Sequence, residues 1–219
     1  MFDAIIWLIT IEIIGFATFP FCYYLFPFLQ DRGYCVSKTI GILTLGYFAW
    51  ILSVSNLLPS IQPTLIGLAL VLVGSSVLFS YKMRKQLRIF IAKHLKMLLV
   101  TEAVFILILL FWVIYKTYDP AINHTEQPMD FAFFNAAIRS VYGHPQDPWL
   151  AGNSIDYYYF GYWILGSVTE MIGIALAVAY NLSIALIAAL SASCIFGLGV
   201  NLVSFDSNKS YSPYLAGGA

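Results

Sequence analysis

Long apolar runs separated by short polar segments are the main pattern along this chain. The runs lie near residues 4–28, 38–58, 63–81, 97–117, 158–179 and 182–204. Each approaches or exceeds the roughly 20 residues that a helix needs to cross the hydrocarbon layer. In each run, apolar residues occur on all sides of the predicted helix instead of forming one stripe. We therefore expect lipid to surround these helices. The pattern predicts an all-α polytopic membrane bundle of about six transmembrane helices, although one kinked segment would also explain the break near Tyr180 and Asn181.

Composition agrees with a membrane protein and excludes several other classes. The chain is 60% hydrophobic and 10% charged, whereas soluble domains are about one quarter charged. Eleven basic residues balance eleven acidic ones, so net charge does not indicate a nucleic-acid partner. The cysteines, Cys22, Cys35 and Cys194, are too scattered to indicate a disulfide framework or a metal knuckle. The lipid bilayer is therefore the first predicted partner.

Basic residues predict the orientation of the chain in the cell membrane. Segment 82–96 carries six of the eleven Lys and Arg residues: Lys82, Arg84, Lys85, Arg88, Lys93 and Lys96. Because cytoplasmic loops are enriched in Lys and Arg, we place this segment in the cytoplasm, together with Arg32 and Lys38. The loop 117–157 and the tail after Phe205 then lie on the non-cytoplasmic side. Segment 82–96 can alternatively form an interfacial helix whose apolar residues enter the headgroup layer, namely Leu87, Ile89, Phe90 and Ile91.

The longest polar connection divides the chain into three parts. Residues 1–116 are predicted to hold four N-terminal transmembrane helices, 117–157 a functional loop, and 158–219 two further transmembrane helices and a tail. The loop region contains five of the eleven acidic residues, namely Asp119, Glu126, Asp130, Asp147 and Asp156. Loops of about forty residues are usually functional or disordered, and the many aromatic residues here argue against disorder.

A short amphipathic helix is predicted inside this loop. Thr125 is a candidate cap, Pro128 suits the first turn, and four apolar residues recur along one face: Phe131, Phe134, Ile138 and Val141. Glu126 and Asp130 are four residues apart and share a face if the helix begins early enough. Two such carboxylates suit a general base with an orienting partner, or a divalent cation. First-turn acids that complement the helix dipole are the alternative interpretation.

The segment after this helix is rich in turn-forming and aromatic residues. Gly143, Pro145, Pro148 and Gly152 predict a rigid turn region. Tyrosines at the start of the next helix suit an interfacial aromatic belt and a ligand platform equally well. The candidate substrate-binding residues of the loop are Arg139, His144, Asp147, Trp149, Asp156, Tyr157, Tyr158 and Tyr159.

Three acidic residues fall inside predicted spans. Glu12, Glu102 and Glu170 lie in apolar runs, where an ionised side chain is costly and usually faces the bundle interior. We expect surface pairing with Lys93 or Lys96 to explain Glu102, whereas Glu170 has no such neighbour. If these acids line a path, the chain is a transporter-like helical bundle.

Longer motifs carry a resemblance to a known family. TEQPMDFAFFNAAIRS at 125–140 is followed by DPWLAGNSIDYYYFGYW at 147–163. With DRGY, NLLP and AYNLSIAL elsewhere in the chain, these segments resemble a family of archaeal and bacterial multi-pass membrane proteins named for its YYY motif. That family is similar to C-type glycosyltransferases, which take sugars from polyprenyl-phosphate carriers on the non-cytoplasmic side. By motif position Asp130 matches the catalytic acid of those enzymes, and Glu126 is second.

The resemblance implies partners as well as an activity. A polyprenyl-phosphate-linked sugar is the implied donor, and Asp130 would deprotonate an acceptor hydroxyl. The chain resembles an N-terminal portion of the longer family members, so further transmembrane subunits or a missing C-terminal part are also expected partners. A non-catalytic scaffold subunit of a larger complex is the alternative function.

Overall fold

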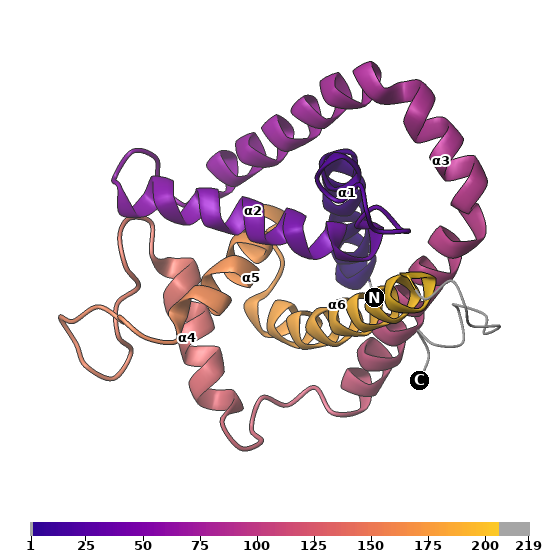
Figure 1. Cartoon of the computed structure of the whole chain (residues 1–219). Helices are drawn as coiled ribbons and strands as arrows, with labels where there is room; N and C mark the ends of the chain where they lie inside the picture. Colours follow the sequence, from indigo (N-terminus) through magenta and orange to yellow (C-terminus); the bar gives the residue numbers. More distant parts are fainter. Residues whose placement is uncertain (1, 206–219) are drawn as a thin grey trace. The chain divides into compact units, whose positions relative to one another are not determined.

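The computed structural model describes residues 2–205, and its regular secondary structure there is entirely helical (Figure 1). The helices are α1 (Phe2–Leu25), α2 (Tyr34–Val54), α3 (Gln62–Tyr118), α4 (Gln127–Arg139), α5 (Tyr159–Ile172) and α6 (Leu176–Phe205). The predicted all-α class is confirmed. The predicted tail after Phe205 lies outside the described residues.

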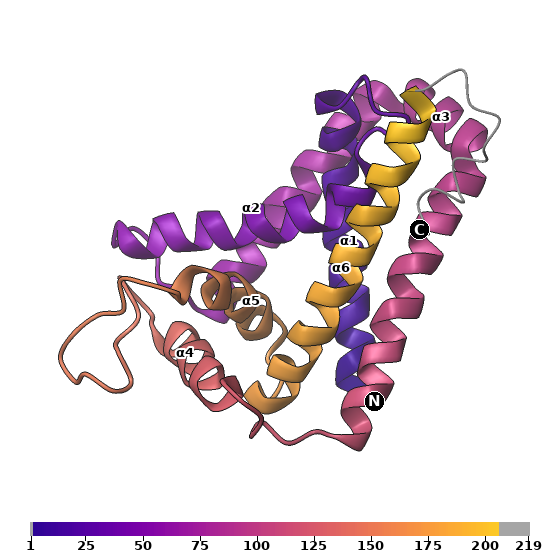
Figure 2. The same cartoon turned by 60° about the horizontal axis from the view of Figure 1, so that its bottom comes forward.

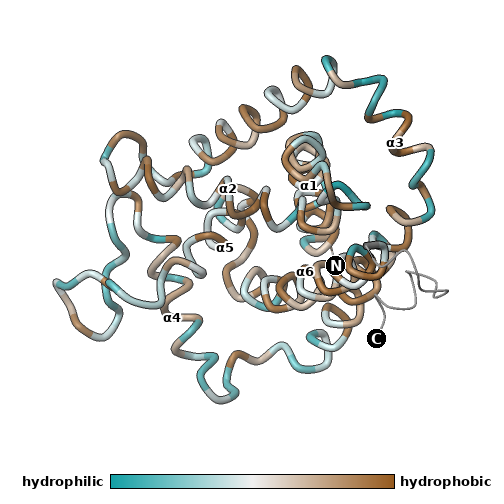
Figure 3. The backbone as a smooth tube through the Cα atoms, in the orientation of Figure 1, coloured by the Kyte–Doolittle hydropathy of each residue, from teal (hydrophilic) through white to brown (hydrophobic). Residues whose placement is uncertain are grey.

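Four of these helices, α1, α2, α3 and α6, are long and apolar enough to cross a membrane. Figure 3 shows apolar, brown stretches in these helices and polar, teal residues in the middle of α3. Helix α5 has only 14 residues. At 1.5 Å per residue this is roughly 21 Å, less than the roughly 30 Å of hydrocarbon. The prediction of a full span over 158–179 is therefore corrected to a shorter helix.

The third and fourth predicted spans form one continuous helix, α3, of 57 residues. Segment 82–96 is helical because it contains many good helix formers and neither Gly nor Pro. Figure 2 shows that α3 bends around its middle, so the apolar stretches on either side of the basic segment run in different directions. A helix of this length is roughly 85 Å along its axis, enough for more than one crossing of the hydrocarbon layer.

The described chain divides into two compact units. Unit 1 comprises residues 2–11, 42–71 and 115–183, and includes α4 and α5. Unit 2 comprises residues 12–41, 72–114 and 184–205. Each unit therefore combines segments that are distant in the sequence.

The core of unit 2 is aromatic and draws on the basic segment of α3. Its buried side chains are Phe19, Tyr34, Leu87, Phe90, Met97, Leu98, Phe196 and Val200. Leu87 and Phe90 therefore pack against other protein side chains. The alternative interpretation, in which they enter the headgroup layer, is wrong for these two residues. Ile89 and Ile91 remain exposed, so the two faces of this helical stretch differ.

Unit 1 holds α4 directly against α5 (Figure 2). The helices approach closely at Gly166, where an added Cβ would lie 2.8 Å from Ile138 Cγ1. Helix α5 ends at Gly173, whose φ of 77° is the left-handed conformation that glycine adopts without strain. The break between the last two predicted spans is thus at Gly173, and Tyr180 and Asn181 lie inside α6.

Candidate functional site

The predicted amphipathic helix exists as α4, with small differences at both ends. Pro128 lies in the first turn as expected, but the N-cap residue is Glu126 and not Thr125. At the other end, the helix stops at Arg139, so Val141 does not extend its apolar face. The Val141 carbonyl instead accepts hydrogen bonds from Ser60 N and Ser53 Oγ. These bonds attach the residues after α4 to the end of α2 and to the segment that follows it.

Asp130 lies in the first turn of α4 and is half-buried. The Tyr162 hydroxyl of α5 donates a hydrogen bond of 2.5 Å to Asp130 Oδ1. Tyr180 also interacts with this carboxylate. Burial, together with the hydrogen bond to Asp130, raises the pKa of Tyr162, so the hydroxyl remains a donor at neutral pH. The hydrogen bond from Tyr162 therefore orients the Asp130 carboxylate, and Tyr180 is near enough to act on it electrostatically.

Glu126 lies in a different environment from Asp130. Its side chain is exposed, and it makes no capping hydrogen bond to α4. Glu126 is near enough to the Tyr162 hydroxyl to act on it electrostatically, but Asp130 is the acid that binds the hydroxyl directly. Of the two predicted catalytic acids, only Asp130 is held by neighbouring side chains in the described part of the chain.

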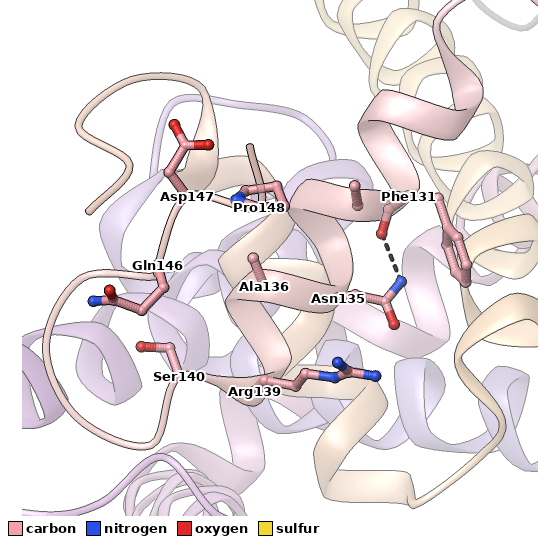
Figure 4. A pocket seen from close by; sticks show the side chains of 9 residues that line it. Phe131, Asn135, Ala136, Arg139, Ser140, Gln146, Asp147 and Pro148 are labelled. Atoms are coloured by element: carbon pink, nitrogen blue, oxygen red, sulfur yellow. Dashed lines mark hydrogen bonds between the residues drawn. The ribbon is translucent and has the colours of Figure 1, made fainter. Parts of the chain in front are cut away.

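A cavity of about 460 Å³ lies beside the exposed face of α4 (Figure 4). Its lining residues are Phe131, Ala132, Asn135, Ala136, Arg139, Ser140, Gln146, Asp147 and Pro148. The Arg139 guanidinium forms no hydrogen bond or ion pair with any residue between 2 and 205, and it is exposed. The cavity therefore combines an available cation with amide and hydroxyl groups, which suits a polar or anionic ligand.

Asp130 does not line this cavity. Helix geometry places Ala132, Asn135 and Arg139 on one face, and Asp130 on the opposite face with buried Phe134. The structure therefore brings Arg139 and Asp147 together, but leaves the predicted catalytic acid on the far side of α4 from them.

Asp147 shapes the loop beside the cavity. Its Oδ1 accepts hydrogen bonds from Trp149 N at 2.8 Å and Leu150 N at 3.0 Å. Gln146 and Ser154 form an isolated antiparallel bridge that closes the same loop. Trp149 is 61% exposed, and its ring packs edge-on against Phe133 of α4. Asp147 therefore folds the turn, and Trp149 remains available at the surface.

The three consecutive tyrosines have different surroundings. Tyr159 is buried, its hydroxyl accepts a hydrogen bond of 2.7 Å from Trp50 Nε1, and its ring lies against His144. Tyr157 and Tyr158 are exposed. Asp156 is also exposed, 3.4 Å from the Ser154 hydroxyl. Tyr159 and His144 thus belong to the packing of unit 1, and Tyr157 and Tyr158 remain candidates for contact with ligand or lipid.

The acids within apolar runs fall into two groups. In unit 2, Glu12 and Glu102 both pair with Lys38, which is only 7% exposed. The structure pairs Glu102 with Lys38, whereas we expected a pairing with Lys93 or Lys96. Lys38 itself lies inside α2, whereas we expected it in a cytoplasmic loop. In unit 1, Glu170 forms no hydrogen bond or ion pair with the described residues.

Sequence reasoning missed two polar partners, Lys38 and Tyr162. Two acids in apolar runs are a signal for a buried cation, and Lys38 stands at the edge of such a run. No comparable signal identifies Tyr162 among the many aromatic residues. As for a divalent cation, no three His, Cys, Asp or Glu side chains between residues 2 and 205 gather as metal ligands.

The helices long enough to cross a bilayer, with a polar site on the loop segment between α3 and α5, define a multi-pass helical membrane protein. The chain belongs to the family of uncharacterized membrane proteins DUF2298, whose family model matches residues 44–217. The matched region includes α4, α5 and the cavity. No curated protein and no solved structure matches the chain.

Proposed function

We propose that this protein is a C-type glycosyltransferase-like membrane protein, which transfers a sugar from a polyprenyl-phosphate carrier to an acceptor on the non-cytoplasmic side. The observation that supports it most is the oriented carboxylate of Asp130, to which Tyr162 donates a hydrogen bond on a short helix between two apolar helices. A simple connector would not need an oriented carboxylate at this place. The motif resemblance supplies the reaction type.

In the proposed reaction, Asp130 accepts the proton of an acceptor hydroxyl. The acceptor oxygen forms a bond to the anomeric carbon of the sugar. The bond between that carbon and the carrier phosphate oxygen breaks, and polyprenyl phosphate leaves with the bonding electron pair. Tyr162 keeps one carboxylate oxygen occupied and thereby directs the other toward the acceptor.

The cavity beside Arg139 suits a part of the substrate that is distant from the reacting bond. Arg139 follows Asp130 by nine residues, roughly 13 Å along the helix axis, and lies on another face. The guanidinium, the Asn135 and Gln146 amides and the Ser140 hydroxyl match sugar hydroxyls or an anionic substituent. In this assignment Arg139 binds substrate, and Asp130 carries out proton transfer.

The decisive experiment compares cells that carry wild-type protein with cells that carry Asp130→Asn. Mass spectrometry of lipid-linked sugars and glycans should show the carrier-linked donor accumulating in the variant and the product falling by about 10²-fold or more, the usual contribution of a general base. Glu126→Gln is the matched control, because this exposed acid lies one turn earlier. A loss with Glu126→Gln alone would move the role to Glu126, and unchanged glycans in both variants would refute the activity.

The proposal also requires the loop 117–157 on the non-cytoplasmic side and segment 82–96 in the cytoplasm. Cysteine substitutions at the exposed Ser154 and Lys93 place one thiol in each segment. A membrane-impermeant thiol reagent applied to intact cells should label Ser154→Cys and not Lys93→Cys. The opposite labelling would contradict the proposed sidedness and, with it, the use of an external lipid-linked donor.

A further inference from the structure

Unit 2 contains a largely buried cluster of ionisable side chains from three helices, which we call the Lys38 cluster: Glu12, Tyr34, Lys38 and Glu102. The Lys38 ammonium on α2 lies 3.1 Å from Glu12 Oε2 on α1 and 2.7 Å from Glu102 Oε2 on α3. The Tyr34 hydroxyl also donates a hydrogen bond of 2.7 Å to Glu102 Oε2. All three helices are long enough to cross a membrane.

The charges of this cluster do not balance when every acid is ionised. Two carboxylates and one ammonium give a net charge of −1, and an uncompensated charge is unfavourable where the acids are only 19% and 16% exposed. Lys38 is the cation that both carboxylates share, so one positive charge faces two acids. The Phe105 ring, whose centroid is 4.5 Å from Lys38 Nζ, stabilises the ammonium but supplies no further positive charge.

One oxygen of Glu12 has no hydrogen-bond partner in the described part of the chain, and this oxygen is the place where a compensating positive charge can bind. Glu12 Oε1 is buried and accepts no hydrogen bond from any donor in residues 2–205. The Glu12 and Glu102 carboxylates both contact the same nitrogen, Lys38 Nζ, so the two carboxyl groups are neighbours. Two neighbouring ionised carboxylates repel each other, whereas a proton on one of them lets it donate an O–H···O hydrogen bond to the other.

We propose that the Lys38 cluster is a proton-binding site, in which Glu12 carries one proton and donates it to Glu102. Binding takes the proton from water and breaks no other bond. The cluster then has no net charge, and Glu102 receives hydrogen bonds from Glu12, Lys38 and Tyr34. Carboxyl groups placed in this way between membrane helices can take up and release protons. This proposal does not rest on the proposed sugar transfer, because unit 2 contains none of the residues assigned to that reaction.

Infrared difference spectroscopy of the full chain in lipid at neutral pH tests the proton count directly. A protonated carboxyl group has a C=O stretching band separate from that of a carboxylate. Relative to wild type, Glu12→Gln should lose one such band, and its amide can donate to Glu102 in place of the proton. Glu102→Gln should also lose one band, because Glu12 then ionises against Lys38. Lys38→Met should gain one band, because both acids become neutral.

Glu126→Gln is the matched control and should leave this band unchanged, because Glu126 is exposed in unit 1. Equal protonated-carboxyl bands in wild type, Glu12→Gln and Glu102→Gln would overturn the proposal. The isosteric Glu12→Gln variant keeps the test usable even if Lys38→Met fails to fold. A wild-type band that disappears when sodium replaces choline in the buffer would also overturn it, since a metal cation would then be the occupant.

Discussion

The position of α4, and with it the orientation of Asp130, depends on the close contact between Ile138 and Gly166. An alanine at Gly166 would place its Cβ 2.8 Å from Ile138 Cγ1, closer than nonbonded carbon atoms approach. Cγ1 is next to a β-branched carbon whose rotamers are restricted in a helix, so the neighbour cannot simply rotate away. We therefore expect Gly166→Ala to push α4 and α5 apart.

The magnitude follows from two opposing terms. Replacing a glycine inside a helix by alanine stabilises it by roughly 0.5–1 kcal/mol. Overpacking costs typically about 1–3 kcal/mol. The net expectation for Gly166→Ala is a loss of about 1 kcal/mol. Gly161 of the same helix has open space where its Cβ would lie, so Gly161→Ala should be neutral or stabilising by about 0.5 kcal/mol.

Thermal unfolding in detergent, followed by tryptophan fluorescence, measures the difference between these variants. Trp163 is 1% exposed in α5 and so reports on this helix pair. A difference of about 1.5 kcal/mol corresponds to a difference of roughly 3–6 °C in Tm for a chain of this size. Adding Ile138→Ala to Gly166→Ala should restore part of the loss, because it removes the clashing atom. If Gly166→Ala is as stable as Gly161→Ala, the close packing of α4 on α5 is refuted.

Three further substitutions test polar contacts. Tyr162→Phe removes the hydrogen bond to Asp130 and should cost about 1–2 kcal/mol of unfolding free energy, with a measurable coupling to Asp130→Asn in a double-mutant cycle. Lys38→Met leaves two buried acids without their cation and should cost about 3–5 kcal/mol, whereas exposed Lys93→Met should change the unfolding free energy by less than about 0.5 kcal/mol. Asp147→Ala removes the acceptor for two backbone amides and should speed proteolysis of the loop at residues 147–153. The Tm should change by no more than about 2 °C. Equal proteolysis rates in wild type and variant would contradict the role of Asp147 in this turn.

Hydrophobic periodicity predicted the fold class and the existence of α4, because both depend on local pattern. Boundaries were harder where the chain continues through a polar segment. The basic stretch of α3 looked like a loop because charge suggests solvent, yet its residues favour helix and its buried face carries Leu87 and Phe90. The end of α5 at Gly173 carried a glycine signal, but the apolar residues that follow concealed it.

The site residues were partly predictable for the same reason. Spacing placed Asp130 and Arg139 on one short helix, but the face that each uses depends on which partner helix buries the other side. Tyr162 packs toward Asp130 from 32 positions away, and Lys38 binds Glu102 from 64 positions away. Such pairings arise from tertiary packing, and no local pattern contains them.

The two polar centres also differ in what they require of the surrounding fold. Asp130 is half-buried, so water can compensate its charge and an acceptor can reach it. Lys38 is 7% exposed and its two acidic partners are largely buried, so these charges are compensated mainly by one another. A substrate-handling role therefore fits the Asp130 region, where exchange with solvent is open. A proton is the ligand that suits the Lys38 cluster, because it needs no cavity larger than the hydrogen bond that holds it.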